Sequence, residues 1–66
     1  MTLEHYFAMG KGDFVMVYGV IDGKTHHLRT FEDGAVASHF MDLCEEYLCG
    51  FYYEEVFDAI NQAVMP

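Results

Sequence analysis

The six residues "VIDGKT", Val20–Thr25, decide the fold of this 66-residue chain. Asp-Gly supplies the positive φ angles that a two-residue type I′ turn requires, and extended-looking runs flank it on both sides. We therefore predict a β-hairpin in which Ile21 pairs with Lys24 and Tyr18 with His27. Continued without a shift, the same register pairs Val17 with Leu28, Met16 with Arg29, Val15 with Thr30 and Phe14 with Phe31.

The first strand of this hairpin, residues 14–21, carries β-branched or aromatic side chains on both faces. Such a strand is typical of the centre of a sheet, so we expect it to be covered on both sides. A central strand needs a second neighbour, and "LEHYFAM", residues 3–9, supplies it. Gly10 and Gly12 then suit a loop of about four residues between the two strands.

Two structures compete for residues 3–9. As a strand, the segment places Leu3, His5, Phe7 and Met9 on one side, by alternation. As a short helix, it would start at Thr2 as the N-cap. We favour the strand because an isolated two-stranded hairpin is only marginally stable in water.

The hydrophobic period becomes helical after Asp33, which is typical of a helix N-cap. Gly50 suits the left-handed residue that ends such a helix. The apolar stripe of this first helix comprises Val36, Phe40, Leu43, Cys44, Tyr47 and Leu48. A second stripe follows at Tyr53, Val56, Phe57, Ile60 and Val64. Residues 50–57 also have the composition of a strand, but the helical spacing continues beyond them, so we favour a helix.

The sequence is nearly a palindrome about Gly50, and this symmetry indicates two antiparallel helices joined by a tight turn. Helix levels at equal distance from Gly50 would then lie side by side: Leu43 with Phe57, Cys44 with Val56, Phe40 with Ile60 and Val36 with Val64. The predicted fold class is α+β. A three-stranded antiparallel β-meander is followed by an antiparallel two-helix hairpin packed on one face of the sheet.

Size and composition limit the function further. A chain this short forms one domain and buries only about 60% of its unfolded surface, whereas 53% of its residues are apolar. Some apolar side chains must therefore be exposed, as at an interface. Two cysteines do not make a disulfide framework, and no signal peptide or bilayer-spanning run is found, so we expect a cytoplasmic protein that does not insert in membranes.

The net charge of −8 is concentrated in the second half of the chain. Residues 1–29 hold three acids and three cations, whereas residues 30–66 hold eight acids and neither Lys nor Arg. Asp42 lies at helical spacing from Glu45 and Glu46, and Asp58 from Glu54 and Glu55. These like-charged pairs together cost about 1–2 kcal/mol, which a single lysine in either cluster would relieve.

This acidic face has two interpretations. It serves solubility alone, or it binds a basic surface by competing with nucleic acid for a basic groove on a partner protein. Nearby tyrosines would add the aromatic contacts that interface hot spots favour. The predicted partner-binding residues are Asp42, Glu45, Glu46, Tyr47, Tyr53, Glu54, Glu55 and Asp58, with Tyr52 close by. Direct binding of nucleic acid is not expected, since three cations cannot offset eleven acids.

In size and charge the chain resembles the small acidic inhibitors that phages and mobile elements make against host nucleic-acid enzymes. These include anti-restriction, anti-CRISPR and glycosylase-inhibitor proteins. The resemblance is one of composition and involves no sequence motif. It implies a non-enzymatic inhibitor or modulator that needs no cofactor and acts on a protein with a nucleic-acid-binding groove.

Two alternatives to the inhibitor stay open. One is a small homodimeric structural or regulatory subunit, joined through its surplus aromatic residues. The other is a metal or small-molecule binder built on His39, Asp42 and Glu46, although a solvated histidine is the more common role for such a residue. No enzyme motif accompanies Cys44 or Cys49, since no histidine is spaced to act as a base. We expect neither catalysis nor a metal site.

Overall fold

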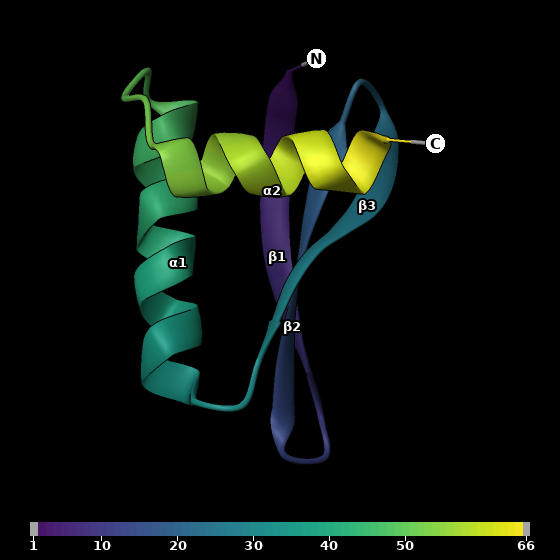
Figure 1. The fold of residues 1–66 in the computed structure, drawn as a ribbon, viewed down its shortest axis with the longest axis vertical. Coiled ribbons are helices and arrows are strands. Elements are labelled where there is room, and N and C mark those ends of the chain that lie inside the picture. The colour runs from purple at the N-terminus through teal and green to yellow at the C-terminus, as the bar shows by residue number, and fades with distance from the viewer. Residues whose placement is uncertain (1, 66) are drawn as a thin grey trace.

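The computed structural model describes residues 2–65 and has three strands followed by two helices. The strands are β1 (Leu3–Lys11), β2 (Phe14–Ile21) and β3 (Lys24–Phe31), and the helices are α1 (Gly34–Leu48) and α2 (Glu54–Val64). The strands form one antiparallel sheet in the order β1-β2-β3, and both helices pack on it (Figure 1). The predicted α+β fold class is confirmed, and residues 3–9 belong to a strand.

Both hairpins close through two-residue turns. Asp22 and Gly23 have φ angles of 51° and 83°, as the predicted type I′ turn requires. The loop between β1 and β2 is shorter than predicted, because Lys11 already pairs with Phe14. Only Gly12 and Asp13 lie between them, and the positive φ of 61° at Gly12 provides the reversal.

A β-bulge in β3 corrects the predicted register of the second hairpin. Ile21 pairs with Lys24 and Tyr18 with His27, as predicted, but Val17 pairs with Arg29. Leu28 is the extra residue, so the more distant pairs are displaced by one position, to Met16 with Thr30 and Val15 with Phe31. The bulge lets Leu28 stay in the core, where it is only 3% exposed.

A second bulge, at Glu4, corrects the predicted faces of β1. The register with β2 shifts between Leu3 and His5. Leu3 is buried under the helices, whereas His5 and Phe7 lie on the opposite face, where Phe7 stacks on Tyr18. The predicted alternation, with Leu3 and Phe7 on one side, therefore fails, because one additional residue reverses the face of every residue beyond it.

Helix α1 has the predicted ends. The Asp33 side chain accepts a hydrogen bond from the Ala35 N–H at 2.8 Å, which caps the N-terminus. At the other end Gly50 has a φ of 105°. The two bonds of a Schellman motif form there, from Gly50 N to Tyr47 O (3.1 Å) and from Phe51 N to Glu46 O (3.0 Å).

The buried face of α1 differs from the prediction at one position. Ala37 is 2% exposed, whereas Val36 is 50% exposed and lies outside the core. Helix α2 begins at Glu54, so the strand alternative for residues 50–57 is wrong. It buries Val56, Ala59 and Ile60 and leaves Phe57 partly exposed.

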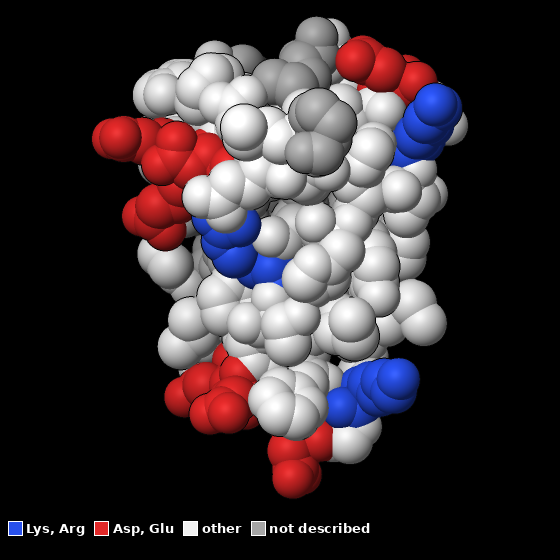
Figure 2. Space-filling model, turned by 45° about the vertical axis from the view of Figure 1, so that its right-hand side comes forward, with Lys and Arg blue, Asp and Glu red and all other residues white. Residues whose placement is uncertain are grey.

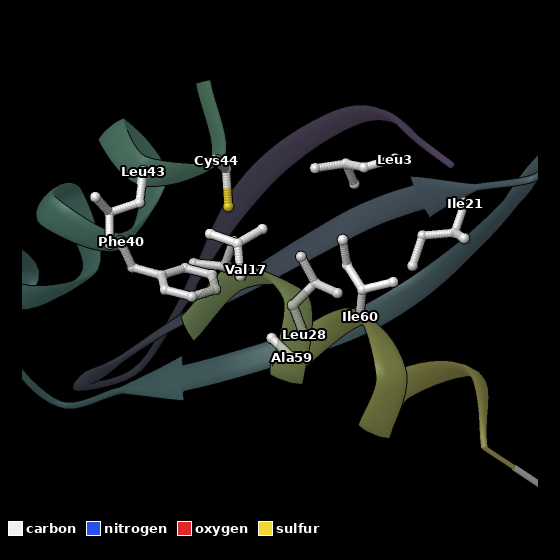
Figure 3. Packing of buried hydrophobic residues seen from close by; sticks show 10 residues of the cluster. Leu3, Val17, Ile21, Leu28, Phe40, Leu43, Cys44, Ala59 and Ile60 are labelled. Carbon is white, nitrogen blue, oxygen red and sulfur yellow. The ribbon is translucent and has the colours of Figure 1, made fainter. Parts of the chain in front are cut away.

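The core is a single cluster between the helices and one face of the sheet (Figure 3). Val17 and Ile21 of the central strand meet Val56 and Cys44 of the helices, and all four are fully buried. The other face of β2, with Met16, Tyr18 and Val20, is only half-buried. The expectation that both faces of β2 are covered is therefore wrong.

The two helices cover different strands. Helix α1 packs on β1 and β2, whereas α2 packs mainly on β3 and runs across the end of α1 rather than along its length (Figure 1). The predicted side-by-side pairing of levels around Gly50 is therefore not formed.

Candidate functional site

The five residues from Cys49 to Tyr53 join the helices and form an exposed aromatic corner. Tyr52 lies against Tyr47 at a ring-centroid distance of 6.4 Å and against Phe57 at 5.7 Å. Phe51 and Tyr52 are 62% and 65% exposed. We define the helix corner as this turn and the residues beside it: Glu46, Tyr47, Phe51, Tyr52, Tyr53, Glu54, Phe57 and Asp58.

One hydrogen bond links the two helices at the corner. Tyr53 Oη donates to Glu46 Oε2 at 2.9 Å, which joins the N-cap residue of α2 to the last turn of α1. This bond is the main cause that raises the pKa of Tyr53, followed by desolvation and the charge of Glu46. The bond places the Glu46 carboxylate beside the start of α2.

The acids of α2 surround the exposed ring of Tyr52. Desolvation raises the pKa of Tyr52, and the negative charges of Glu54 and Asp58 raise it further. Glu46, Glu54 and Asp58 are all exposed, and no cation among residues 2–65 pairs with them. The corner thus presents carboxylates and aromatic rings together, without a neutralising charge.

The remaining predicted site residues lie elsewhere. Burial raises the pKa of Tyr6 on β1, and the charges of Glu45 and Asp42 raise it further, so these two acids lie toward the β1 side of α1. Glu55 is exposed, and its side chain makes no hydrogen bond. In the view of Figure 2 the carboxylates gather in separate groups at the rim, some of them with Lys or Arg nearby. Asp42 and Glu45 act on Tyr6, whereas Glu54 and Asp58 act on Tyr52, so the eight predicted residues do not form one flat array.

The helix termini explain some of these charges but not others. Glu54 and Glu55 lie in the first turn of α2, where no side chain caps the helix and the positive end of its dipole favours carboxylates. Glu45 and Glu46 lie near the C-terminus of α1, where the dipole end is negative, and no basic residue lies in the last turn. The helix dipoles therefore account for the α2 pair and disfavour the α1 pair.

The structure has a second exposed surface, on the side of the sheet away from the helices. We define the open sheet face by the side chains that the strands direct there: His5, Phe7, Met9, Lys11, Phe14, Met16, Tyr18, Val20, Thr25, His27 and Thr30. The rings of Phe7 and Tyr18 stack at 5.3 Å with an interplanar angle of 16°. His5 continues this row on one side and His27 on the other.

Sequence reasoning missed this face because it expected β2 to be covered on both sides. One signal was present in Gly19, at the middle of β2. A glycine within a strand often marks a close approach of other groups, which here are the Leu3 and Leu28 side chains on the helix side. The helix side of the strand was therefore the crowded one.

Comparison with family models, with curated proteins and with solved structures finds no match. Neither helix within residues 2–65 has the length and apolar content that crossing a bilayer requires. Over the same residues, no three His, Cys, Asp or Glu side chains come together as metal ligands would. A proposal for the function therefore rests on the two surfaces described above, the helix corner and the open sheet face.

Proposed function

We propose that the chain is a small non-enzymatic protein-interaction module whose helix corner occupies a basic, nucleic-acid-binding surface of a partner protein, as an inhibitor or modulator. The observation that carries this proposal is the placement of Glu46, which lies in the helix corner beside Glu45. Both carboxylates lie at the negative end of the α1 dipole, and no Lys or Arg among residues 2–65 pairs with them; Glu46 accepts a hydrogen bond from Tyr53, which brings no positive charge. A charge placed at a structural disadvantage favours a role in binding.

The chemistry of the corner suits a groove that binds nucleic acid. Such grooves present Lys and Arg to phosphates and often stack bases on flat side chains. Glu46, Glu54 and Asp58 offer anions in place of phosphates, and Tyr52 offers an exposed ring beside the last two. Arginine recognises both groups, through paired hydrogen bonds to carboxylates and through stacking on aromatic faces.

The alternative, that the acids serve solubility alone, does not require a particular position for them. Exposed carboxylates promote solubility wherever they lie, including sites where they also stabilise the fold. Glu54 and Glu55 fit that role, whereas Glu45 and Glu46 do not. A comparison of variants that differ only in where the charge is removed separates the two explanations.

The test is capture of partner proteins on the immobilised chain, at about 50 mM and about 500 mM salt. The variant Glu45→Gln/Glu46→Gln removes two charges near the corner. The control Asp13→Asn/Glu32→Gln removes two exposed charges elsewhere and leaves the same net charge. We expect basic nucleic-acid-binding proteins to be captured by the wild type and the control at low salt, and to be lost with the first variant or at high salt.

Two results would contradict the proposal. Capture that is equal at both salt concentrations would mean that charge does not drive binding. Equal loss in the two double variants would mean that net charge, and not the corner, attracts the partner. In either case solubility would be the better explanation for the acidic residues.

A further inference from the structure

We propose that the helix corner binds one arginine side chain of its partner, with the guanidinium group stacked in the hollow beside Tyr47 and Tyr52 and paired with the neighbouring carboxylates. This inference rests on the proposed function and names the chemical group by which the partner is held. The hollow has a volume of about 190 Å³ and is lined by Tyr47, Gly50, Phe51 and Tyr52. A cation that enters it therefore meets aromatic rings on most sides.

The two tyrosine rings are placed so that one cation can contact both. Their centroids lie 6.4 Å apart and their planes are inclined by 43°. A cation is attracted to an aromatic ring when it lies over the face within about 6 Å of the centroid. At the open side of this inclined pair, a single group can lie within that distance of Tyr47 and Tyr52 together.

The residues that line the hollow differ in what they contribute to the fold. Tyr47 packs against the hydrophobic core, whereas Phe51 and Tyr52 lie outside it and are 62% and 65% exposed. The turn itself depends on Gly50, which has the positive φ. Small and polar residues are usual in such a turn, so folding does not explain two large aromatic side chains there. Exposed apolar groups rimmed by charged residues are typical of an interaction site.

The charge around the hollow is complementary to a cation. Glu54 and Asp58 raise the pKa of Tyr52, so their carboxylates lie close enough to act on this ring. The α1 helix ends at the same place, and the negative end of its dipole adds to the charge of Glu46. No basic residue lies in the last turn of α1. An arginine from the partner would supply the cation that this helix end lacks.

Arginine fits this combination of groups better than lysine does. Its guanidinium group is planar and weakly hydrated, so it stacks on aromatic rings and also donates paired hydrogen bonds to a carboxylate. The ammonium group of lysine is a strongly hydrated point charge that can pair with the carboxylates but has no flat face to stack. Of the basic residues in a nucleic-acid-binding groove, the corner should therefore select an arginine.

Two labelled basic peptides of equal charge test this inference. One contains arginine as its only cation and the other lysine, in equal number and separated by glycines. Fluorescence anisotropy at about 50 mM salt measures their binding to the whole chain. The variant Tyr52→Leu removes the ring but leaves the net charge at −8. The control Phe14→Leu removes an exposed ring from the open sheet face.

We expect the wild type and Phe14→Leu to bind the arginine peptide about two- to fivefold more tightly than the lysine peptide. Tyr52→Leu should bind both peptides equally, at the level of the lysine peptide. In proton NMR spectra of the wild type, the arginine peptide should shift the ring signals of Tyr47 and Tyr52 and leave those of Phe14 in place. Circular dichroism verifies the fold of each variant.

Three results would overturn the inference: equal affinity of the wild type for the two peptides, an arginine preference that Tyr52→Leu retains, or no binding of either peptide. Failure of the proposed function is distinguishable from these. Capture of partner proteins would then be equal at low and high salt, whereas an arginine preference that depends on Tyr52 would persist. Conversely, salt-sensitive capture that Tyr52→Leu leaves unchanged would support the proposed function and contradict the arginine site.

Discussion

Tyr53 Oη donates a hydrogen bond of 2.9 Å to Glu46 Oε2, and this contact joins the end of one helix to the start of the next. It forms at the helix corner, where α2 turns away across the end of α1 (Figure 1). The contact places the Glu46 carboxylate next to the N-cap residue of α2. A contact that restricts a side chain of the proposed binding surface lowers the entropic cost of association.

The ionisation of Tyr53 tests this contact. The Glu46 carboxylate accepts a hydrogen bond from the protonated phenol of Tyr53, and this raises the pKa of Tyr53. Glu46→Gln removes the charge, so we expect Tyr53 to ionise at a lower pH than in the wild type. Ultraviolet titration of tyrosinate measures this shift, and Tyr53→Phe identifies which transition belongs to Tyr53. An unchanged titration curve in Glu46→Gln would show that the bond is not formed in solution.

Removing the charges near the C-terminus of α1 should increase stability. Glu45→Gln/Glu46→Gln eliminates two unfavourable interactions with the helix dipole, each typically about 0.3–1 kcal/mol at low ionic strength. The amide introduced at position 46 keeps an oxygen that can accept the hydrogen bond from Tyr53 Oη, so this contact between the helices is not deleted. We expect the free energy of unfolding to rise in this variant, measured by urea denaturation, while capture of the partner falls. The control Asp13→Asn/Glu32→Gln should change stability less. A loss of stability in the first variant would contradict the reasoning that these charges are retained for binding.

Alkaline pH should destabilise the fold through Cys44. Burial raises the pKa of its thiol from 9.0 to about 11, so the folded state disfavours the thiolate. Stability from this group is complete below pH 9 and is lost as the pH rises through about 11. We expect Cys44→Ala to be less stable than the wild type at neutral pH. Between pH 9 and about 11, however, the variant should lose less stability than the wild type, as urea denaturation at each pH would show. Parallel curves for the two proteins would contradict this assignment.

The two thiols should differ in reactivity. Cys44 is buried and Cys49 is exposed, and both are free. A disulfide reagent added to the native chain should modify Cys49 rapidly and Cys44 only on unfolding, because thiol–disulfide exchange requires an accessible thiolate. Cys49→Ser should remove the rapid phase alone. Two thiols that react at the same rate would indicate that the core around Cys44 is open.

Two glycines within strands, Gly10 and Gly19, provide a matched pair of sites for testing how tightly the sheet is packed. A Cβ added at Gly19 would lie 2.8 Å from Leu3 Cδ1 and 2.9 Å from Leu28 Cδ1, whereas at Gly10 no atom lies within 4 Å. We expect Gly19→Ala to cost about 1–3 kcal/mol of unfolding free energy through overpacking. Gly10→Ala should be neutral or slightly stabilising. Equal effects in denaturation experiments would mean that the Leu3 and Leu28 side chains do not pack over Gly19 as described.

Local features were predictable from the sequence. The Asp22-Gly23 turn, the cap at Asp33 and the glycine after α1 each follow from φ angles or hydrogen bonds that a few neighbouring residues determine. The bulges at Glu4 and Leu28 do not, because a strand with one extra residue has the same composition as a regular one. Their positions follow from the burial of Leu3 and Leu28 under the helices.

The candidate site was predictable in part, for the same reason. The charge cluster and the tyrosines could be identified from composition and spacing. The palindrome about Gly50 could not define the angle between the helices, since it constrains only the apolar face of each helix. That angle depends on the width and twist of the sheet beneath them. It places Asp42 and Glu45 toward β1 and gathers Glu46, Glu54 and Asp58 around the corner.

Competition with nucleic acid tests the central claim most directly. A captured partner protein is loaded with a labelled nucleic acid, and the chain is added while the fluorescence anisotropy of the label is followed. The helix corner is proposed to occupy the nucleic-acid-binding surface itself, so we predict that the wild type releases the label and that Glu45→Gln/Glu46→Gln releases it less well. A stable complex that contains the partner, the nucleic acid and the chain together would contradict the account.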